Sequence, residues 1–331
     1  MTLLSVRDLT VKFATRNEPV TALHGISFDI AQGERVGVVG ESGAGKSITG
    51  FALMNLLSKP GFIDSGQILF EGQDVTQMSD RAVRKLRGNR MAMIFQDPMV
   101  TLNPVLTIGQ QMIETLRAHR RLSYDEARQI ALVKLKGVYI PSPEERLDQY
   151  PHELSGGMRQ RIVIAIALLL DPQLIIADEP TTALDVTIQA DIMELLLELC
   201  RSNMVGLMLI THDLGVVSQV TERTLVMYAG RIIESGKTRA IINDPQHPYT
   251  QGLINALPQQ TPPGTRLRQI PGSMPTLSMM PSGCPFNPRC ELATDLCRAN
   301  MPDITQFGEV QVACHEVQRL QADLNTAEAA Q

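Results

Sequence analysis

The chain has 331 residues, of which 44% are hydrophobic and 20% are charged, and its formal net charge is −5. This length is sufficient for two domains, or for one domain with a substantial appendage, and the acidic balance argues against nucleic acid as the main partner. The first residues lack the basic start and apolar core of a signal peptide, and the longest apolar run, residues 162–170, is too short to cross a bilayer. We therefore expect a cytoplasmic protein that reaches a membrane only through partner subunits.

Two antiparallel strands are predicted at the start of the chain, because residues 3–13 and 20–30 alternate between apolar and polar positions. Residues 34–40 predict a buried strand, and residues 48–57 predict a helix. Short apolar runs later in the chain predict further buried strands of an α/β sheet. These runs are residues 92–95, 174–177, 205–210 and 224–228.

A phosphate-binding loop is predicted between the strand at 34–40 and the helix that follows it. Gly40-Glu-Ser-Gly-Ala-Gly-Lys46-Ser47 fits the pattern G-x-x-x-x-G-K-[ST] without a mismatch. Its glycines allow successive N–H groups to face the phosphates, Lys46 reaches the outer phosphates, and the Ser47 hydroxyl binds Mg²⁺. A glycine-rich turn without function is the alternative, and the strand–loop–helix context disfavours it. The predicted ATP-binding residues of the loop are Gly40, Glu41, Ser42, Gly43, Ala44, Gly45, Lys46, Ser47 and Ile48.

A helical insertion of about residues 98–165 is predicted between two strands of the core. Within it, the stretches Ser123 to Glu126 and Ser142 to Glu145 both fit the capping-box pattern, the second with proline at the first helical position. After Asp185, an apolar stripe at helical spacing predicts a helix that faces the core.

Two carboxylates follow the apolar run at 174–177. Asp178 is placed to hold Mg²⁺ through water, and Glu179 to polarise an attacking water molecule. A surface Asp-Glu pair at the start of a loop is the alternative, which the phosphate loop elsewhere in the same chain makes much weaker.

A second anion site is predicted at Leu154-Ser155-Gly156-Gly157-Met-Arg-Gln160, immediately before a long apolar helix. Ser155 is a favourable helix cap, and the two glycines leave the first N–H groups of the helix uncovered. This site is too far from the phosphate loop in sequence to be part of it.

The order of these motifs resembles that of the ABC transporter ATPase family. The phosphate loop, Gln96, the Ser155 motif, the Asp178-Glu179 pair, Ala183-Leu184-Asp185 and Thr211-His212-Asp213 follow one another as in that family, over residues 1 to about 240. The resemblance implies an α/β fold: an ABC-type nucleotide-binding domain with a RecA-like P-loop core, an N-terminal antiparallel β subdomain and an inserted α-helical subdomain.

The resemblance also implies roles for single residues. Glu179, His212 and Gln96 are the expected catalytic residues, and Phe13 is expected to stack on adenine, although a core phenylalanine is nearly as good an interpretation. For His212 the alternative is a buried core histidine. The Mg²⁺ ligands implied are Ser47, Gln96 and Asp178. The residues expected to face the ATP of an opposite ATPase subunit are Leu154, Ser155, Gly156, Gly157 and Gln160, with Asp185 at the dimer seam.

Three further stretches resemble the di- and oligopeptide importer ATPases, a subfamily with relatives that import nickel or glutathione. They are residues 94–104, residues 150–161 and His247-Pro-Tyr-Thr250. This resemblance implies an ATPase domain at 1–242 and an importer-type extension at 243–331. It also implies two membrane permease subunits, a second homologous ATPase, an extracytoplasmic substrate-binding protein, and a peripheral location at the cytoplasmic face of the inner membrane. The transported molecule is not fixed by the sequence.

Four of the five cysteines lie close to the C-terminus, with the spacing C-x5-C-x6-C-x16-C. This spacing matches neither common zinc sites nor a ferredoxin run, so from spacing alone a metal site and unliganded thiols both stay open. The small loop-rich extension fits the peptide importers, and that resemblance implies a [4Fe–4S] cluster, with Zn²⁺ as the alternative. The expected ligands are Cys284, Cys290, Cys297 and Cys314.

The sequence disfavours two other functions. A soluble ABC ATPase acting on ribosomes or DNA is disfavoured, because such relatives carry two cassettes or a long coiled-coil insertion, whereas this chain has one cassette and is acidic. A non-catalytic ATP-binding module is disfavoured because the catalytic set is complete: Lys46, Asp178, Glu179 and His212 are all present.

Overall fold

The computed structural model describes residues 1–181, 185–257 and 269–317. Contacts within the chain divide it into two compact units. The first unit comprises residues 1–4, 30–34 and 70–209, and the second comprises residues 5–29, 35–69 and 210 onward.

The first unit contains three neighbouring strands in the order β8-β7-β6, of which β6 and β7 are parallel. All three are fully buried apolar runs, as the sequence predicts for strands covered on both faces. The strands are β6 (Met91–Ile94), β7 (Leu174–Asp178) and β8 (Gly206–Ile210), and a short β5 (Gln73–Asp74) precedes them.

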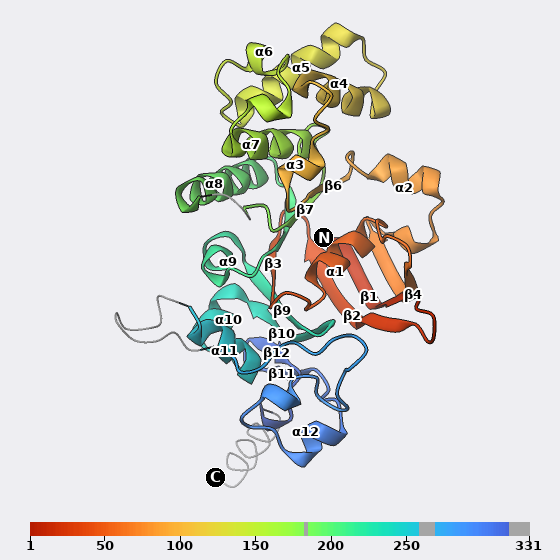
Figure 1. Cartoon of the computed structure of the whole chain (residues 1–331), viewed down its shortest axis with the longest axis vertical. Coiled ribbons are helices and arrows are strands. Elements are labelled where there is room, and N and C mark those ends of the chain that lie inside the picture. The colour runs from red at the N-terminus through yellow and green to blue at the C-terminus, as the bar shows by residue number, and fades with distance from the viewer. Residues whose placement is uncertain (182–184, 258–268, 318–331) are drawn as a thin grey trace. The chain divides into compact units, whose positions relative to one another are not determined.

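The helices of the first unit include the insertion between β6 and β7, where α4, α5 and α7 pack against one another (Figure 1). Arg128 on α5 forms a bidentate pair with Asp148, and Arg161 on α7 donates to the carbonyl of Val138. The helices are α2 (Asp80–Leu86), α3 (Pro98–Thr101), α4 (Ile108–His119), α5 (Tyr124–Gly137), α6 (Pro143–Arg146), α7 (Gly156–Ala167) and α8 (Val186–Ser202).

One of the two predicted capping boxes is confirmed and the other is wrong. At α5 the Ser123 hydroxyl accepts from the Glu126 N–H, and the Glu126 carboxylate accepts from the Ser123 N–H. At α6, Ser142 has a left-handed backbone with φ 46°, and its side chain makes no cap hydrogen bond. The following proline disfavours the right-handed helical region for Ser142, and its left-handed backbone also departs from the extended conformation that a capping serine usually has.

The second unit contains two groups of strands. One has the order β2-β1-β4, and the other the order β11-β12-β10-β9-β3, in which β3 and β9 are parallel and the later pairs are antiparallel. The first group is β1 (Thr2–Phe13), β2 (Val20–Ala31) and β4 (Gly61–Phe70). The second is β3 (Arg35–Val39), β9 (Arg223–Tyr228), β10 (Arg231–Lys237), β11 (Thr305–Phe307) and β12 (Val310–Val312).

The helices of the second unit flank these strands, and α9 and α10 both contact the second group. The helices are α1 (Lys46–Leu53), α9 (Leu214–Val220), α10 (Thr238–Asn243), α11 (Pro248–Asn255) and α12 (Asp295–Ala299).

The C-terminal segment is continuous with the second unit. Strand β12 adds to β10, with Val312 opposite Glu234 and Val310 opposite Gly236. Phe286 lies in one aromatic cluster with Tyr228 and Tyr249, with ring centroids 4.7–5.4 Å apart. The contacts therefore place no division at residue 242, the boundary predicted from the sequence, and that domain boundary stays a prediction.

Candidate nucleotide-binding site

The phosphate loop has the predicted strand–loop–helix setting, since it joins the end of β3 to the start of α1. Gly40 and Gly45 are required by close approach as well as by their positive φ angles of 154° and 101°. A Cβ at Gly40 would lie 2.3 Å from the carbonyl oxygen of Met227, and a Cβ at Gly45 would lie 2.9 Å from the Leu23 side chain. The loop backbone therefore lies too close to β9 and β2 for a side chain at either position, and the glycines are needed for the loop conformation that binds phosphates.

Lys46 is 5% exposed, and its Nζ donates to the carbonyl oxygens of Gly40 and Glu41 at 2.8 and 3.0 Å. The ammonium group is therefore held within the loop. Ser42 and Gly43 are exposed, whereas Ser47 and Ile48 are half-buried and Ala44 is buried.

Glu179, the carboxylate predicted to be catalytic, lies at the end of β7, beside Gln96, which follows β6. Ile94 and Ala177 are partners in the parallel β6–β7 ladder, so Gln96 and Glu179 leave the same edge of the sheet. Gln96 Nε2 donates to Glu179 Oε2 at 3.2 Å. Glu179 has a left-handed backbone with φ 45°, a strained conformation that concentrates at functional sites. Asp178, beside it, is 4% exposed.

The Ser155 loop caps α7 as predicted, because the Ser155 Oγ accepts from the Met158 N–H at 3.3 Å. Ser155 is exposed and Gly156 and Gly157 are half-buried. Leu154 and Gln160 differ, being only 5% and 1% exposed, and the Gln160 Nε2 has no hydrogen-bond partner among the described residues. Both side chains are therefore buried within the chain. Their contact with another subunit's ATP stays a prediction.

The other predicted site residues are accessible. His212 is exposed directly after β8, so the alternative of a buried core histidine is wrong. Phe13 is half-buried at the end of β1, and Asp185 is exposed at the start of α8. The neighbouring Ala183 and Leu184 lie outside the described residues. The Mg²⁺ ligand set and the adenine contact stay predictions.

The four C-terminal cysteines line one small hollow, together with the buried His247. Burial, with smaller contributions from the neighbouring cysteines, raises the pKa of the Cys284 thiol to about 11. Burial also raises the pKa of Cys290 and of Cys314. Four thiols are a suitable donor set for iron or zinc. However, in the described part of the chain no three Cys, His, Asp or Glu side chains are arranged to hold a metal ion.

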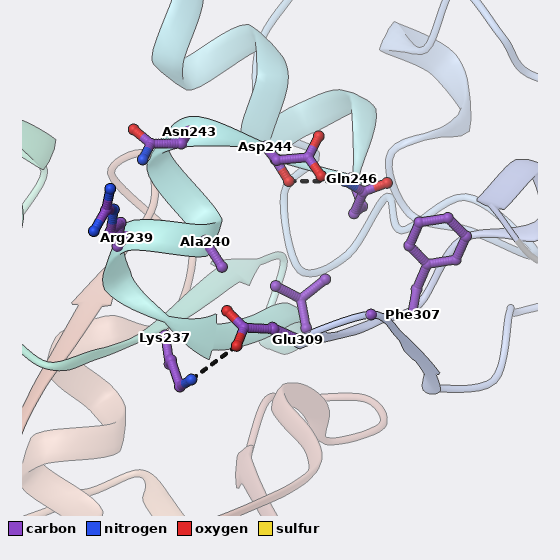
Figure 2. A pocket seen from close by; sticks show the side chains of 10 residues that line it. Lys237, Arg239, Ala240, Asn243, Asp244, Gln246, Phe307 and Glu309 are labelled. Atoms are coloured by element: carbon purple, nitrogen blue, oxygen red, sulfur yellow. Dashed lines mark hydrogen bonds and ion pairs between the residues drawn. The ribbon is translucent and has the colours of Figure 1, made fainter.

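A second hollow, of about 610 Å³, lies between α10 and the β11–β12 turn (Figure 2). Lys237 forms an ion pair with Glu309 across it at 2.8 Å. Arg239 and Asp244 add one charge of each sign to its lining. This mixture selects no ligand of one sign, and none of the predicted site residues lines the hollow.

Sequence analysis missed one ion pair at the phosphate loop. The Arg289 guanidinium donates to both carboxylate oxygens of Glu41, at 2.6 and 3.0 Å. The sequence gives no signal for this pair, because 248 residues separate Glu41 from Arg289 and no motif links them.

The phosphate loop, the Gln96–Glu179 pair and the Ser155 cap on this α/β frame define an ATP-binding cassette ATPase. The family model "ABC transporter" matches residues 23–182. Among solved structures, the ATP-binding cassette MJ0796, a dimer bound to ADP and Pi, is 28% identical and has a TM-score of 0.64, over 71% of this chain and 99% of that chain. The protein cbiO1 from Clostridium perfringens, part of the ABC transporter complex cbiONQ, is 29% identical with a TM-score of 0.63, over 73% and 91%.

The C-terminal part of the chain shows to which branch of this family the chain belongs. The model "Oligopeptide/dipeptide transporter, C-terminal region" matches residues 233–297. The dipeptide transport ATP-binding protein DppD of Haemophilus influenzae is 47% identical, over 95% of this chain and 96% of its own. The oligopeptide transport ATP-binding protein OppD of Salmonella typhimurium is 48% identical, over 92% and 90%. The chain belongs to the family of ATP-binding subunits of dipeptide and oligopeptide ABC transporters.

Proposed function

We propose that this chain is the ATP-hydrolysing subunit that powers import of di- or oligopeptides through a membrane ABC transporter. The single observation that carries the hydrolytic role is the hydrogen bond from Gln96 to Glu179, because it holds a carboxylate at the strand end where water must be activated. The peptide class is supported by the names of the relatives, DppD and OppD.

The proposed mechanism begins with the phosphate loop. The N–H groups of the loop and the N-terminus of α1 bind the phosphates, and the Lys46 ammonium moves from the loop carbonyls to the outer phosphates. Mg²⁺, when bound, neutralises phosphate charge, with the Ser47 hydroxyl and Asp178 as its proposed ligands. Glu179 then orients and polarises the attacking water, and Gln96 fixes the position of the Glu179 carboxylate.

We propose that hydrolysis requires a second, homologous ATPase subunit. The capped N-terminus of α7 presents the exposed Ser155 and positive partial charge, which suits the γ-phosphate of a nucleotide bound by that subunit. The dimer of the relative MJ0796, bound to ADP and Pi, supports such an arrangement. Closure of the dimer around ATP would exclude bulk solvent and set Glu179 against the γ-phosphate, and hydrolysis would allow the dimer to open.

We propose that two permease subunits dock near Gln96. Between β6 and α4, Met99, Val100 and Val105 are 44%, 83% and 74% exposed, an apolar group next to a catalytic residue. A permease contact there would reach Glu179 through Gln96. No described helix has the length and apolarity to cross a membrane. Because its relatives are transport ATP-binding proteins, we propose that the chain lies at the cytoplasmic face of the inner membrane, in a system with an extracytoplasmic substrate-binding protein.

The test is purification of the chain from membranes together with its permease and second ATPase. We expect the reconstituted complex to hydrolyse ATP faster when peptide and the substrate-binding protein are added. A matched preparation with Val100→Asp should lose the permeases while keeping its own ATP binding, because a charge in the apolar group disfavours docking. Full ATPase activity without any membrane subunit, and no stimulation by peptide, would contradict the transport role.

We further propose that Cys284, Cys290, Cys297 and Cys314 hold a [4Fe–4S] cluster. The proposal is supported by the position of all four cysteines in the lining of one hollow. In the described part of the chain, their side chains are not arranged as metal ligands. Anaerobically purified protein should be brown, with about four iron atoms per chain, and Cys290→Ser should remove the iron. The same substitution at the buried Cys200 is the control. A colourless protein with zinc, or with neither metal, contradicts the cluster.

A further inference from the structure

All polar groups of Glu41, the first variable residue of the phosphate loop, are engaged. Its N–H donates to the Tyr249 hydroxyl at 2.7 Å, and its carbonyl oxygen accepts from Lys46 at 3.0 Å. Its carboxylate accepts both bonds from Arg289. Tyr249 and Arg289, from the last third of the chain, therefore hold the start of the loop. All of these contacts lie within the second unit.

Arg289 is itself rigidly placed. Its side chain is 5% exposed, and its Nε donates to the Pro271 carbonyl at 2.8 Å. Its guanidinium lies 5.9 Å from the ring centroids of both Tyr228 and Phe286. A sheltered bidentate pair of this kind is costly to break, because removal of one partner leaves the other charge uncompensated.

Tyr249 holds the backbone of the same residue. Its side chain is fully buried on α11, and its N–H donates to the Nδ1 of His247, which caps that helix, at 3.0 Å. Its ring packs edge-on against Tyr228 and Phe286. Burial raises the pKa of Tyr249, so its hydroxyl stays neutral and accepts the Glu41 N–H.

We propose that Arg289 and Tyr249 are positioning residues for nucleotide binding, which act through Glu41. Tyr249 fixes the backbone at the start of the loop in the conformation that accepts phosphates. Arg289 neutralises a carboxylate that would otherwise repel the triphosphate from the residue next to its cradle. The proposal rests on ATP binding by the phosphate loop, not on transport. It assigns the C-terminal segment, which the phosphate loop motif does not require, a role in ATP affinity.

The test measures ATP affinity of the full-length chain with Mg²⁺ by calorimetry. Arg289→Ala should weaken binding about tenfold, and Arg289→Lys less, because lysine keeps the charge but loses the fork. Tyr249→Phe removes one hydroxyl and should weaken binding about threefold, since the Glu41 N–H loses its partner. Lys237→Ala is the matched control: its exposed pair with Glu309 also joins the C-terminal hairpin to β10, but does not touch the loop (Figure 2).

A double variant separates positioning from general damage. Adding Glu41→Gln to Arg289→Ala should restore ATP affinity to within about threefold of the unchanged protein, because the uncompensated charge is gone. Losses that add, or variants that bind ATP as well as the unchanged protein, overturn the proposal. If Arg289→Ala does not fold by circular dichroism, Tyr249→Phe decides alone. An unchanged protein that binds no ATP rejects the nucleotide site itself, a distinct failure.

Discussion

Glu179→Gln is expected to slow ATP hydrolysis by about two to four orders of magnitude while ATP binding is retained. Glutamine can still accept the hydrogen bond that Gln96 donates, so the strained backbone at this position and its neighbour Asp178 keep their places. The substitution removes the negative charge that we propose polarises the attacking water. The phosphate loop is untouched by the change.

The measurement compares turnover and ATP affinity of the assembled ATPase pair with and without the substitution. Size-exclusion chromatography with Mg·ATP should show the variant trapped as a dimer, because the closed state is no longer released by hydrolysis. Glu198→Gln is the matched control, since Glu198 is a carboxylate on α8 that accepts a hydrogen bond from the hydroxyl of the exposed Tyr139. Equal hydrolysis rates for the Glu179 variant and the unchanged protein would remove Glu179 from its proposed role.

The parts of the fold that the sequence predicts are those where one local signal decides the outcome. Apolar runs as short as residues 92–95 and 174–177 predict β6 and β7, because strands buried on both faces require continuous apolar side chains. The sequence does not predict that these two strands are neighbours, and the contact between Gln96 and Glu179 follows from their parallel pairing in the structure. The phosphate loop can be recognised from its sequence motif alone, although Gly40 and Gly45 also lie close to Met227 and Leu23, which the motif does not predict.

The parts that the sequence does not predict depend on partners far along the chain. Strands β11 and β12 have three residues each, too few for an alternating pattern. They form because β12 pairs with the edge of β10 and β11 pairs with β12. Arg289 lies among the C-terminal cysteines, far from Glu41 in the sequence. The two residues meet because the chain folds back here, where Phe286 packs against Tyr228. Local rules also fail where the backbone overrides them, as at Ser142.

Ser155→Arg is expected to leave ATP binding by this chain intact and to lower hydrolysis at the opposite subunit's site by about a hundredfold or more. The exposed Oγ of Ser155 caps α7 through the Met158 N–H, and a bulky arginine both removes that cap and obstructs the approach of a γ-phosphate. Loss of the cap alone costs about 1 kcal/mol of helix stability, which is too little to explain such a fall in rate.

The control for Ser155→Arg is another serine cap in the same unit. Ser123 accepts from the Glu126 N–H at 3.3 Å, the same distance that the Ser155 cap shows, and it begins the neighbouring helix α5. Ser123→Arg should therefore reproduce the loss of thermal stability without the loss of hydrolysis. Ser155→Thr, which keeps a capping oxygen, should retain most of the activity. If Ser155→Arg and Ser123→Arg lower hydrolysis equally, the effect belongs to the helical insertion as a whole, and the exposed start of α7 does not face a second subunit's nucleotide.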